Sequence, residues 1–177
     1  MKPGFKISRK EELIFQSKNY DSTYGEITKK GVDQLIKQCE FKNKIVLDLG
    51  CGTGNLLKFL CIKNIKCQKL IGIELSEERC ELAKKNLHAY QKKYSILIIQ
   101  EDILNFSLSN CNIIYISNLC FPEWLNRALG KKIDKEIREK TVVFSSKELY
   151  CNDYVKKNRS ILNQSWDSIS ILWIYYF

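Results

Sequence analysis

Three glycines at alternate positions, Gly50, Gly52 and Gly54, follow an apolar run in the sequence and precede a helical pattern that starts at Asn55. Glycine lets the backbone turn sharply and approach a ligand without a Cβ atom in the way, and a helix N-terminus favours negative charge. The sequence therefore predicts a loop that binds a small ligand. A dinucleotide site of the GxGxxG kind would need its third glycine at position 55, so the spacing disfavours NAD.

Carboxylates end the next two apolar runs. Glu74 ends the run Leu70–Glu74, where a carboxylate can accept both hydroxyl protons of a ribose. Glu101 and Asp102 follow the run Ser95–Gln100, and from there a carboxylate can reach an adenine amino group. Together with the glycine loop, these acids predict a nucleoside site.

From residue 43 onward, short apolar or β-branched runs alternate with longer helical patterns, which is typical of a parallel sheet covered on both faces. The expected strands are Ile45–Leu49, Leu70–Glu74, Ser95–Gln100, Ile113–Ile116 and Val142–Ser145. Ser76 is expected to cap a helix that runs to about Gln91, with Glu77 and Glu78 in its first turn. The tail Ile169–Phe177 is rich in strand formers and predicts a buried closing strand.

The first 40 residues hold no strand-like run and are expected to form a loop around Tyr20–Glu26, followed by a helix from about Thr28 to Cys39. A length of 177 residues fits one ordinary core. We therefore expect an α/β fold in which residues 1–40 form a loop and a short helical lid over the ligand site, and residues 41–177 form the core.

Basic residues outnumber acidic ones by 29 to 20, which gives a net charge of +9. This balance favours anionic partners such as nucleic acid, although the lysine pairs are spread along the chain and also fit an unspecific lysine-rich composition. No apolar run approaches the roughly 20 residues of a membrane span, and the N-terminus lacks the apolar stretch of a signal peptide. We expect an intracellular protein with no membrane contact.

The eight cysteines form no CxxC pair and only one histidine accompanies them, so no metal site is expected. Cys39, Cys61, Cys80 and Cys120 lie among apolar or helical positions, where a free thiol acts as a small hydrophobe. They are expected to fill the core.

The order of these elements resembles that of the class I S-adenosylmethionine methyltransferases, which have a Rossmann-like fold. The order is strand, glycine loop, helix, acid-ended strand, helix and a second acid-ended strand. The resemblance implies S-adenosylmethionine as the cofactor. It implies that Asp48 orients the loop and the methionine end, that Glu74 holds the ribose and that Asp102 contacts the adenine. The full implied cofactor set is Tyr24, Glu26, Asp48, Gly50, Cys51, Gly52, Gly54, Asn55, Glu74, Leu75, Glu101, Asp102, Ile103 and Asn118.

The segment Ser117–Pro122 after the fourth strand faces the reactive sulfonium in that fold. It lacks the Pro-Pro box of enzymes that methylate amino groups of nucleic acids. Pyrimidine C5 methylation needs a cysteine nucleophile, commonly after proline, whereas Cys120 follows Leu119. Both nucleic-acid chemistries are therefore disfavoured.

Four segments resemble the DOT-type histone lysine methyltransferases, over roughly residues 20 to 177. They are Tyr24-Gly25-Glu26, Ser117-Asn118-Leu119-Cys120-Phe121, Phe144-Ser145-Ser146-Lys147 and Ser165-Trp166. The sequence departs from that family where Ser117 replaces the first of two asparagines, and where the glycine loop reads Gly-Cys-Gly-Thr-Gly instead of Gly-Ser-Gly-Val-Gly. The resemblance implies a mouth around the sulfonium made by Tyr24, Asn118, Phe121 and Trp166.

Lysine methylation needs a neutral amine, because an ammonium has no lone pair, and an aromatic channel can lower a lysine pKa by stripping water from it. The implied substrate is a histone or nucleosome, in the nucleus or on chromatin. Two alternatives stay open: the substrate is a different basic protein or RNA, or the protein is a binding module without turnover. For these alternatives a cytoplasmic location is expected. The oligomeric state is left open.

Overall fold

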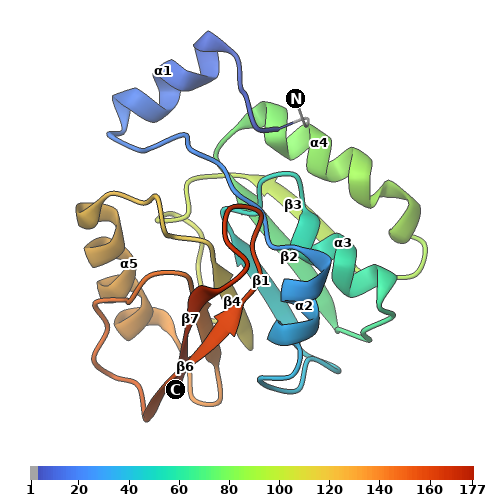
Figure 1. The fold of residues 1–177 in the computed structure, drawn as a ribbon, viewed down its shortest axis with the longest axis vertical. Coiled ribbons are helices and arrows are strands. Elements are labelled where there is room, and N and C mark those ends of the chain that lie inside the picture. The colour runs from blue at the N-terminus through green and yellow to red at the C-terminus, as the bar shows by residue number, and fades with distance from the viewer. Residues whose placement is uncertain (1–3) are drawn as a thin grey trace.

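The computed structural model describes residues 4–177 and contains one seven-stranded sheet with the strand order β3-β2-β1-β4-β5-β7-β6 (Figure 1). The five strands from β3 to β5 are parallel, and β7 is antiparallel to both of its neighbours. The strands are β1 Ile45–Leu49, β2 Lys69–Glu74, β3 Ile96–Gln100, β4 Ile113–Ile116, β5 Val142–Ser145, β6 Lys156–Leu162 and β7 Ser170–Tyr176.

Helices cover both faces of this sheet, because each face is apolar. The helices are α1 Arg9–Ser17, α2 Lys29–Leu35, α3 Asn55–Ile62, α4 Glu77–Leu87, the short 3-10 helix η1 His88–Tyr90 and α5 Glu123–Glu136. Residues of α2, α3 and α4 share one core cluster with Val46 and Phe144, and residues of α5 share the other with Leu47 and Val143. This is the expected Rossmann-like arrangement.

Helix α1 lies outside these two layers, above the sheet at the upper left of Figure 1. Two backbone contacts tie it there: the N–H of Ser8 donates to the Glu78 carboxylate at 3.1 Å, and the N–H of Glu77 donates to Glu11 at 3.0 Å. The chain then crosses the carboxyl ends of the parallel strands, where the glycine loop lies. Among residues 4–177 no helix is long and apolar enough to cross a membrane.

Five expected strands are confirmed, with bounds that differ by at most one residue, and the helix after Ser76 is confirmed as α4. Two expectations were wrong, and strand β6 and helix α1 were not predicted. The tail forms β7, but β7 lies inside the sheet and does not close it. Strand β6, at the edge, was not predicted, because its sequence Lys-Lys-Asn-Arg-Ser-Ile-Leu carries charges that suit an exposed edge strand. The helix expected over 28–39 ends at Leu35.

Candidate active site

The glycine loop turns immediately after β1. Gly50, Gly52 and Gly54 have φ values of +80°, +53° and +80°, a region that other residues rarely adopt. A Cβ atom at Gly54 would lie 2.9 Å from Leu87 Cδ1, so this glycine permits the close packing of α3 on α4. A Cβ atom at Gly52 would lie 2.1 Å from the Tyr24 ring. The loop therefore has a shape that only glycine allows.

Two buried carboxylates lie beneath this loop. Glu74 accepts hydrogen bonds from the N–H groups of Gly52 at 2.8 Å and Ser76 at 3.0 Å, and burial raises its pKa against the opposing charge of Arg79. Asp48 is 4% exposed, and its carboxylate has no hydrogen-bond or ion-pair partner within residues 4–177. Burial and the neighbouring Glu74 raise the pKa of Asp48 to about 8. A cationic ligand group beside Asp48 would satisfy this carboxylate.

An open cavity of about 230 Å³ lies between the glycine loop and the segments that cross it. It is lined by Phe15, Tyr20, Asp21, Thr23, Tyr24, Gly25, Gly50, Glu74, Leu75, Arg79, Ile103, Ser117, Leu119, Cys120, Phe121, Pro122, Leu125 and Trp166. A second cavity of about 20 Å³ shares Tyr24, Gly25, Gly50 and Ser117 with the first. The smaller one is completed by Glu26, Ile27, Asp48, Cys51, Asn55, Leu56 and Tyr115. The two cavities therefore adjoin at Tyr24.

The mouth of the larger cavity is built from two distant parts of the chain. The N–H of Ser165 donates to the Glu26 carbonyl at 2.8 Å, and the N–H of Glu26 donates to the Ser165 hydroxyl at 3.0 Å. The Trp166 ring lies directly on Gly25, where a Cβ atom would be 1.9 Å from Trp166 Cζ3. The Tyr24 loop and the turn between β6 and β7 thus form one unit.

Tyr24 is also fixed from below. Its hydroxyl donates to Glu26 at 2.9 Å and accepts from the N–H of Thr53 at 3.0 Å. Burial, followed by the charge of Glu26, raises the Tyr24 pKa above its ordinary value, so the phenol stays protonated. The ring is held between the two cavities in one orientation.

The N-terminal segment reaches Asp102, the acid expected to contact adenine. Lys18 Nζ lies 3.0 Å from its carboxylate, and the Tyr20 hydroxyl donates to it at 2.8 Å. Burial raises the Asp102 pKa, but the N–H of Leu104, Lys18 and Tyr20 together lower it below the ordinary carboxyl value. Tyr20 also stacks on Trp124 of α5, with ring centroids 5.3 Å apart. In this structure Lys18 and Tyr20 of the N-terminal segment occupy the Asp102 carboxylate.

Arg79, in the first turn of α4, fastens the same segment and was not predicted from the sequence. It is 3% exposed, and its guanidinium donates to the carbonyls of Gly4 at 3.0 Å and Ser22 at 2.8 Å. It lies over the Tyr24 ring, 4.6 Å from the centroid. From sequence alone an arginine in a helix is expected to be exposed. The burial of Arg79 depends on the carbonyls of Gly4 and Ser22, which are far away in sequence.

Most of the expected site residues line one of the two cavities. Those that do are Tyr24, Glu26, Asp48, Gly50, Cys51, Asn55, Glu74, Leu75, Ile103, Phe121 and Trp166. Those that do not are Gly52, Gly54, Glu101, Asp102 and Asn118. Glu101 accepts hydrogen bonds from its neighbours Asp102 and Asn105.

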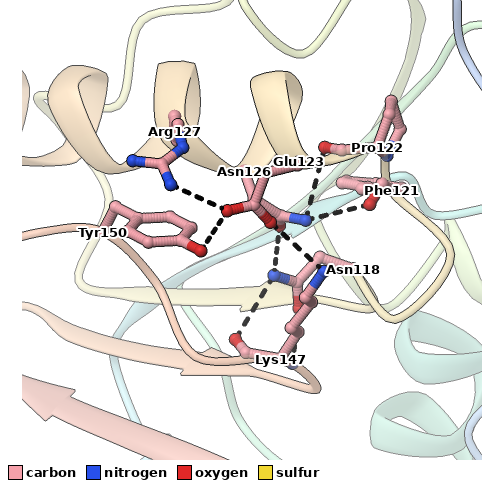
Figure 2. Close-up of polar contacts among 8 residues, drawn as sticks. All are labelled: Asn118, Phe121, Pro122, Glu123, Asn126, Arg127, Lys147 and Tyr150. Carbon is pink, nitrogen blue, oxygen red and sulfur yellow. Dashed lines mark hydrogen bonds and ion pairs between the residues drawn. The ribbon is translucent and has the colours of Figure 1, made fainter.

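Asn118 is completely buried, and its amide bonds to Asn126 and to the backbone of Lys147 (Figure 2). The preceding residue, Ser117, lines both cavities. The DOT-type family has an asparagine at the position of Ser117, and this is the signal by which Ser117 could have been found. Cys120 is also exposed and lines the cavity, so its expected place in the core was wrong. No metal-binding group of three or more side chains occurs among residues 4–177.

Solved structures establish the class of fold. An RNA methyltransferase from Salinibacter ruber in complex with S-adenosyl-L-homocysteine has a TM-score of 0.63 and 15% identity, over 82% of this chain and 88% of that chain. At this identity the match shows the fold, which is Rossmann-like. The family model described as "Histone methylation protein DOT1" matches residues 7–170, so the chain belongs to that family.

Curated relatives differ in what their names state. The H3 lysine-79 specific histone-lysine N-methyltransferase of Eremothecium gossypii is 29% identical over 124 residues, 62% of this chain and 22% of that protein. The malonyl-[acyl-carrier protein] O-methyltransferase of Priestia megaterium is 30% identical over 170 residues, 88% of this chain and 60% of that protein. The chain therefore spans less than two thirds of the length of these relatives.

Proposed function

We propose that the protein is a lysine N-methyltransferase that acts on a core histone within chromatin. The observation that carries this proposal is the joint opening made by Tyr24, Phe121 and Trp166 above the glycine loop. These aromatic residues come from three of the segments that resemble the DOT-type family, and the fold brings them to one cavity. A nuclear or chromatin location follows from the substrate.

The residues present fit the cofactor. Asp48 offers an unpartnered buried carboxylate for the methionine ammonium group, and Gly50 leaves room beside it. We assign Glu74 to the ribose and Leu75 and Ile103 to the adenine, since all three line the larger cavity. When bound, S-adenosylmethionine supplies an electrophilic methyl group on a sulfonium.

Asp102 can take part only if Lys18 and Tyr20 share or release its carboxylate. This supports the proposal that the described part of residues 1–40 caps the cofactor site, with residues 41–177 as the core. Cofactor entry would then require movement of the segment that Arg79 and Asp102 hold.

The aromatic wall would prepare the amine for attack. Phe121 and Trp166 exclude water from an inserted lysine side chain, which lowers its pKa and leaves a lone pair on the nitrogen. The wall also holds the nitrogen in line with the sulfonium, and such positioning alone can change rates by about 100-fold. No general base is needed, because the ammonium loses its proton to water as the side chain enters the cavity and its pKa falls.

The substrate is tested by incubating the protein with tritiated S-adenosylmethionine and separate pools of nucleosomes, free histones, total protein and RNA. We expect label on a histone lysine nitrogen, located by mass spectrometry. Label on RNA, favoured by the charge of +9, or on a different basic protein would contradict the histone proposal. No label in any pool would favour a binding module without turnover.

The channel is tested with Trp166→Ala. Turnover should fall on the order of 10- to 100-fold, whereas affinity for S-adenosylhomocysteine changes little, because Trp166 positions the amine and does not hold the adenosine. Val155→Ala, which is 84% exposed and away from the cavity, is the control. Equal losses of turnover and affinity would contradict a role in the channel.

A further inference from the structure

We infer that Asn126 of α5 is a positioning residue that fixes the wall of the cavity on the acceptor side. This wall is the loop 117–122. It contributes Ser117, Leu119, Cys120, Phe121 and Pro122 to the cavity lining. The acceptor side is defined by the proposed function, and the inference rests on it in that respect.

Two buried amides join the loop to the helix behind it (Figure 2). Asn118 and Asn126 both have 0% exposure. Asn118 Nδ2 donates to Asn126 Oδ1 at 2.7 Å, and Asn126 Nδ2 donates to the carbonyl of Phe121 at 3.0 Å. Asn126 thus bonds to the side chain near the start of the loop and to the backbone near its end.

The opposite side of Asn118 is tied to the segment after β5. The N–H of Lys147 donates to Asn118 Oδ1 at 2.9 Å, and Asn118 Nδ2 also reaches the Lys147 carbonyl at 3.3 Å. The loop is therefore held by α5 and by the segment after β5. Because asparagine does not titrate, these bonds hold at any ordinary pH.

Neither asparagine lines a cavity, so neither touches a bound ligand. Their effect passes through the residues they hold. A buried polar group that loses its partner is destabilised, so removing Asn126 would drive the Phe121 carbonyl and the Asn118 amide toward new partners. The wall would change shape while the glycine loop and Glu74 stay in place.

The test compares Asn126→Ala with Asn112→Ala as a control. Asn112 lies directly before β4, at the end of that strand away from the loop, and its Oδ1 accepts the N–H of Ile45 at 2.9 Å. Hydrogen exchange is followed by mass spectrometry on peptides that cover 117–122. We expect exchange there to rise at least about tenfold in Asn126→Ala and to stay unchanged in the control. Affinity for S-adenosylhomocysteine, measured by calorimetry, should change less than about threefold.

Asn126→Asp keeps the size of the side chain and serves if Asn126→Ala does not fold. Its ionised carboxylate accepts from Asn118 but cannot donate to Phe121, so loop exchange should rise in this variant as well. For any acceptor found, kcat should fall at least about tenfold with little change in the KM for the cofactor. Asn118→Ala combined with Asn126→Ala should lose less than the sum of the two single losses, because both substitutions remove the bond between the two amides.

Unchanged exchange in 117–122 in the folded Asn126 variants would overturn the inference, as would an equal rise in Asn112→Ala. An additive double variant would overturn it too. Exchange and calorimetry need no acceptor, so a failure of the histone proposal is read separately, from the label in the substrate pools.

Discussion

At the scale of single residues, Asp48 has an unusual environment. It is buried without a partner, next to a second carboxylate, and its pKa is raised from 3.8 to about 8. The folded chain therefore keeps a proton that the unfolded chain releases, between about pH 4 and pH 8. The free energy of unfolding should fall as pH rises through this window, by up to about 1.4 kcal/mol per pH unit.

Asp48→Asn should reduce this pH dependence and raise the free energy of unfolding at pH 8, while it weakens binding of S-adenosylhomocysteine; the raised pKa of Glu74 accounts for the dependence that stays. Urea unfolding at pH 5 and pH 8, with calorimetry for the ligand, measures both effects. Asp153→Asn changes an exposed carboxylate and serves as the control. If Asp48→Asn and the native chain show the same slope against pH, Asp48 is ionised in the fold and this account is wrong.

Gly25 offers a second test at this scale. A Cβ atom there would lie 1.9 Å from Trp166 Cζ3, so Gly25→Ala must displace the indole from the mouth. Turnover should fall on the order of 10- to 100-fold, as for Trp166→Ala, and the double variant should be no worse than either. Steady-state kinetics of the three variants decides this, and additive losses would show that Gly25 and Trp166 act independently.

At the scale of elements, Arg79 joins α4 to the N-terminal segment through the carbonyls of Gly4 and Ser22. Arg79→Met should release that segment, and trypsin should then cut after Lys18 at least about tenfold faster. The control is Arg127→Met, whose guanidinium lies on an exposed ring, 4.3 Å from the centroid of Tyr150. Equal cleavage rates in the native chain and Arg79→Met would show that other contacts hold the segment.

The elements also show how far sequence reasoning reaches. Strands β1, β2, β4 and β5 were predictable because parallel strands buried on both faces are continuous apolar runs. Strand β6 was not, since an edge strand with charged residues has no such run. Helix α1 was missed because its packing depends on α4 contacts far away in sequence.

The site shows the same division. The glycine loop and Glu74 are local features. Their residue types and their places at the end of a strand are enough to predict where they lie in the fold. Arg79, Asn126 and Ser117 depend on partners from other elements, and periodicity says nothing about those. The core placement expected for Cys120 was wrong for this reason, because the sequence does not show which side of a loop a residue faces.

At the scale of the whole molecule, the eight cysteines are all free, and Cys120 is the one whose side chain is exposed; five are buried and two are half-buried. Burial, followed by the charge of Asp21, raises the pKa of Cys120, so its reaction with maleimide at neutral pH should be moderate in rate. In the native protein we expect one adduct, at Cys120, to form well before any other. After unfolding we expect eight adducts, counted by intact mass.

S-adenosylhomocysteine should slow this single modification, because Cys120 lines the same cavity as Glu74 and Leu75. Cys120→Ser provides the control, which should show no fast adduct. Several fast adducts in the native chain would contradict the burial of the other thiols.

The position of β7 bears on how the chain is completed during synthesis. Strand β6 is made first, yet within residues 4–177 its one neighbour in the sheet is β7, which follows it in the chain. Until Ser170–Tyr176 has left the ribosome, β6 has no strand to pair with, and the turn that carries Trp166 is not yet held on its β7 side. A nascent chain that stops before β7 therefore lacks two strands and one wall of the mouth, although its glycine loop is already complete.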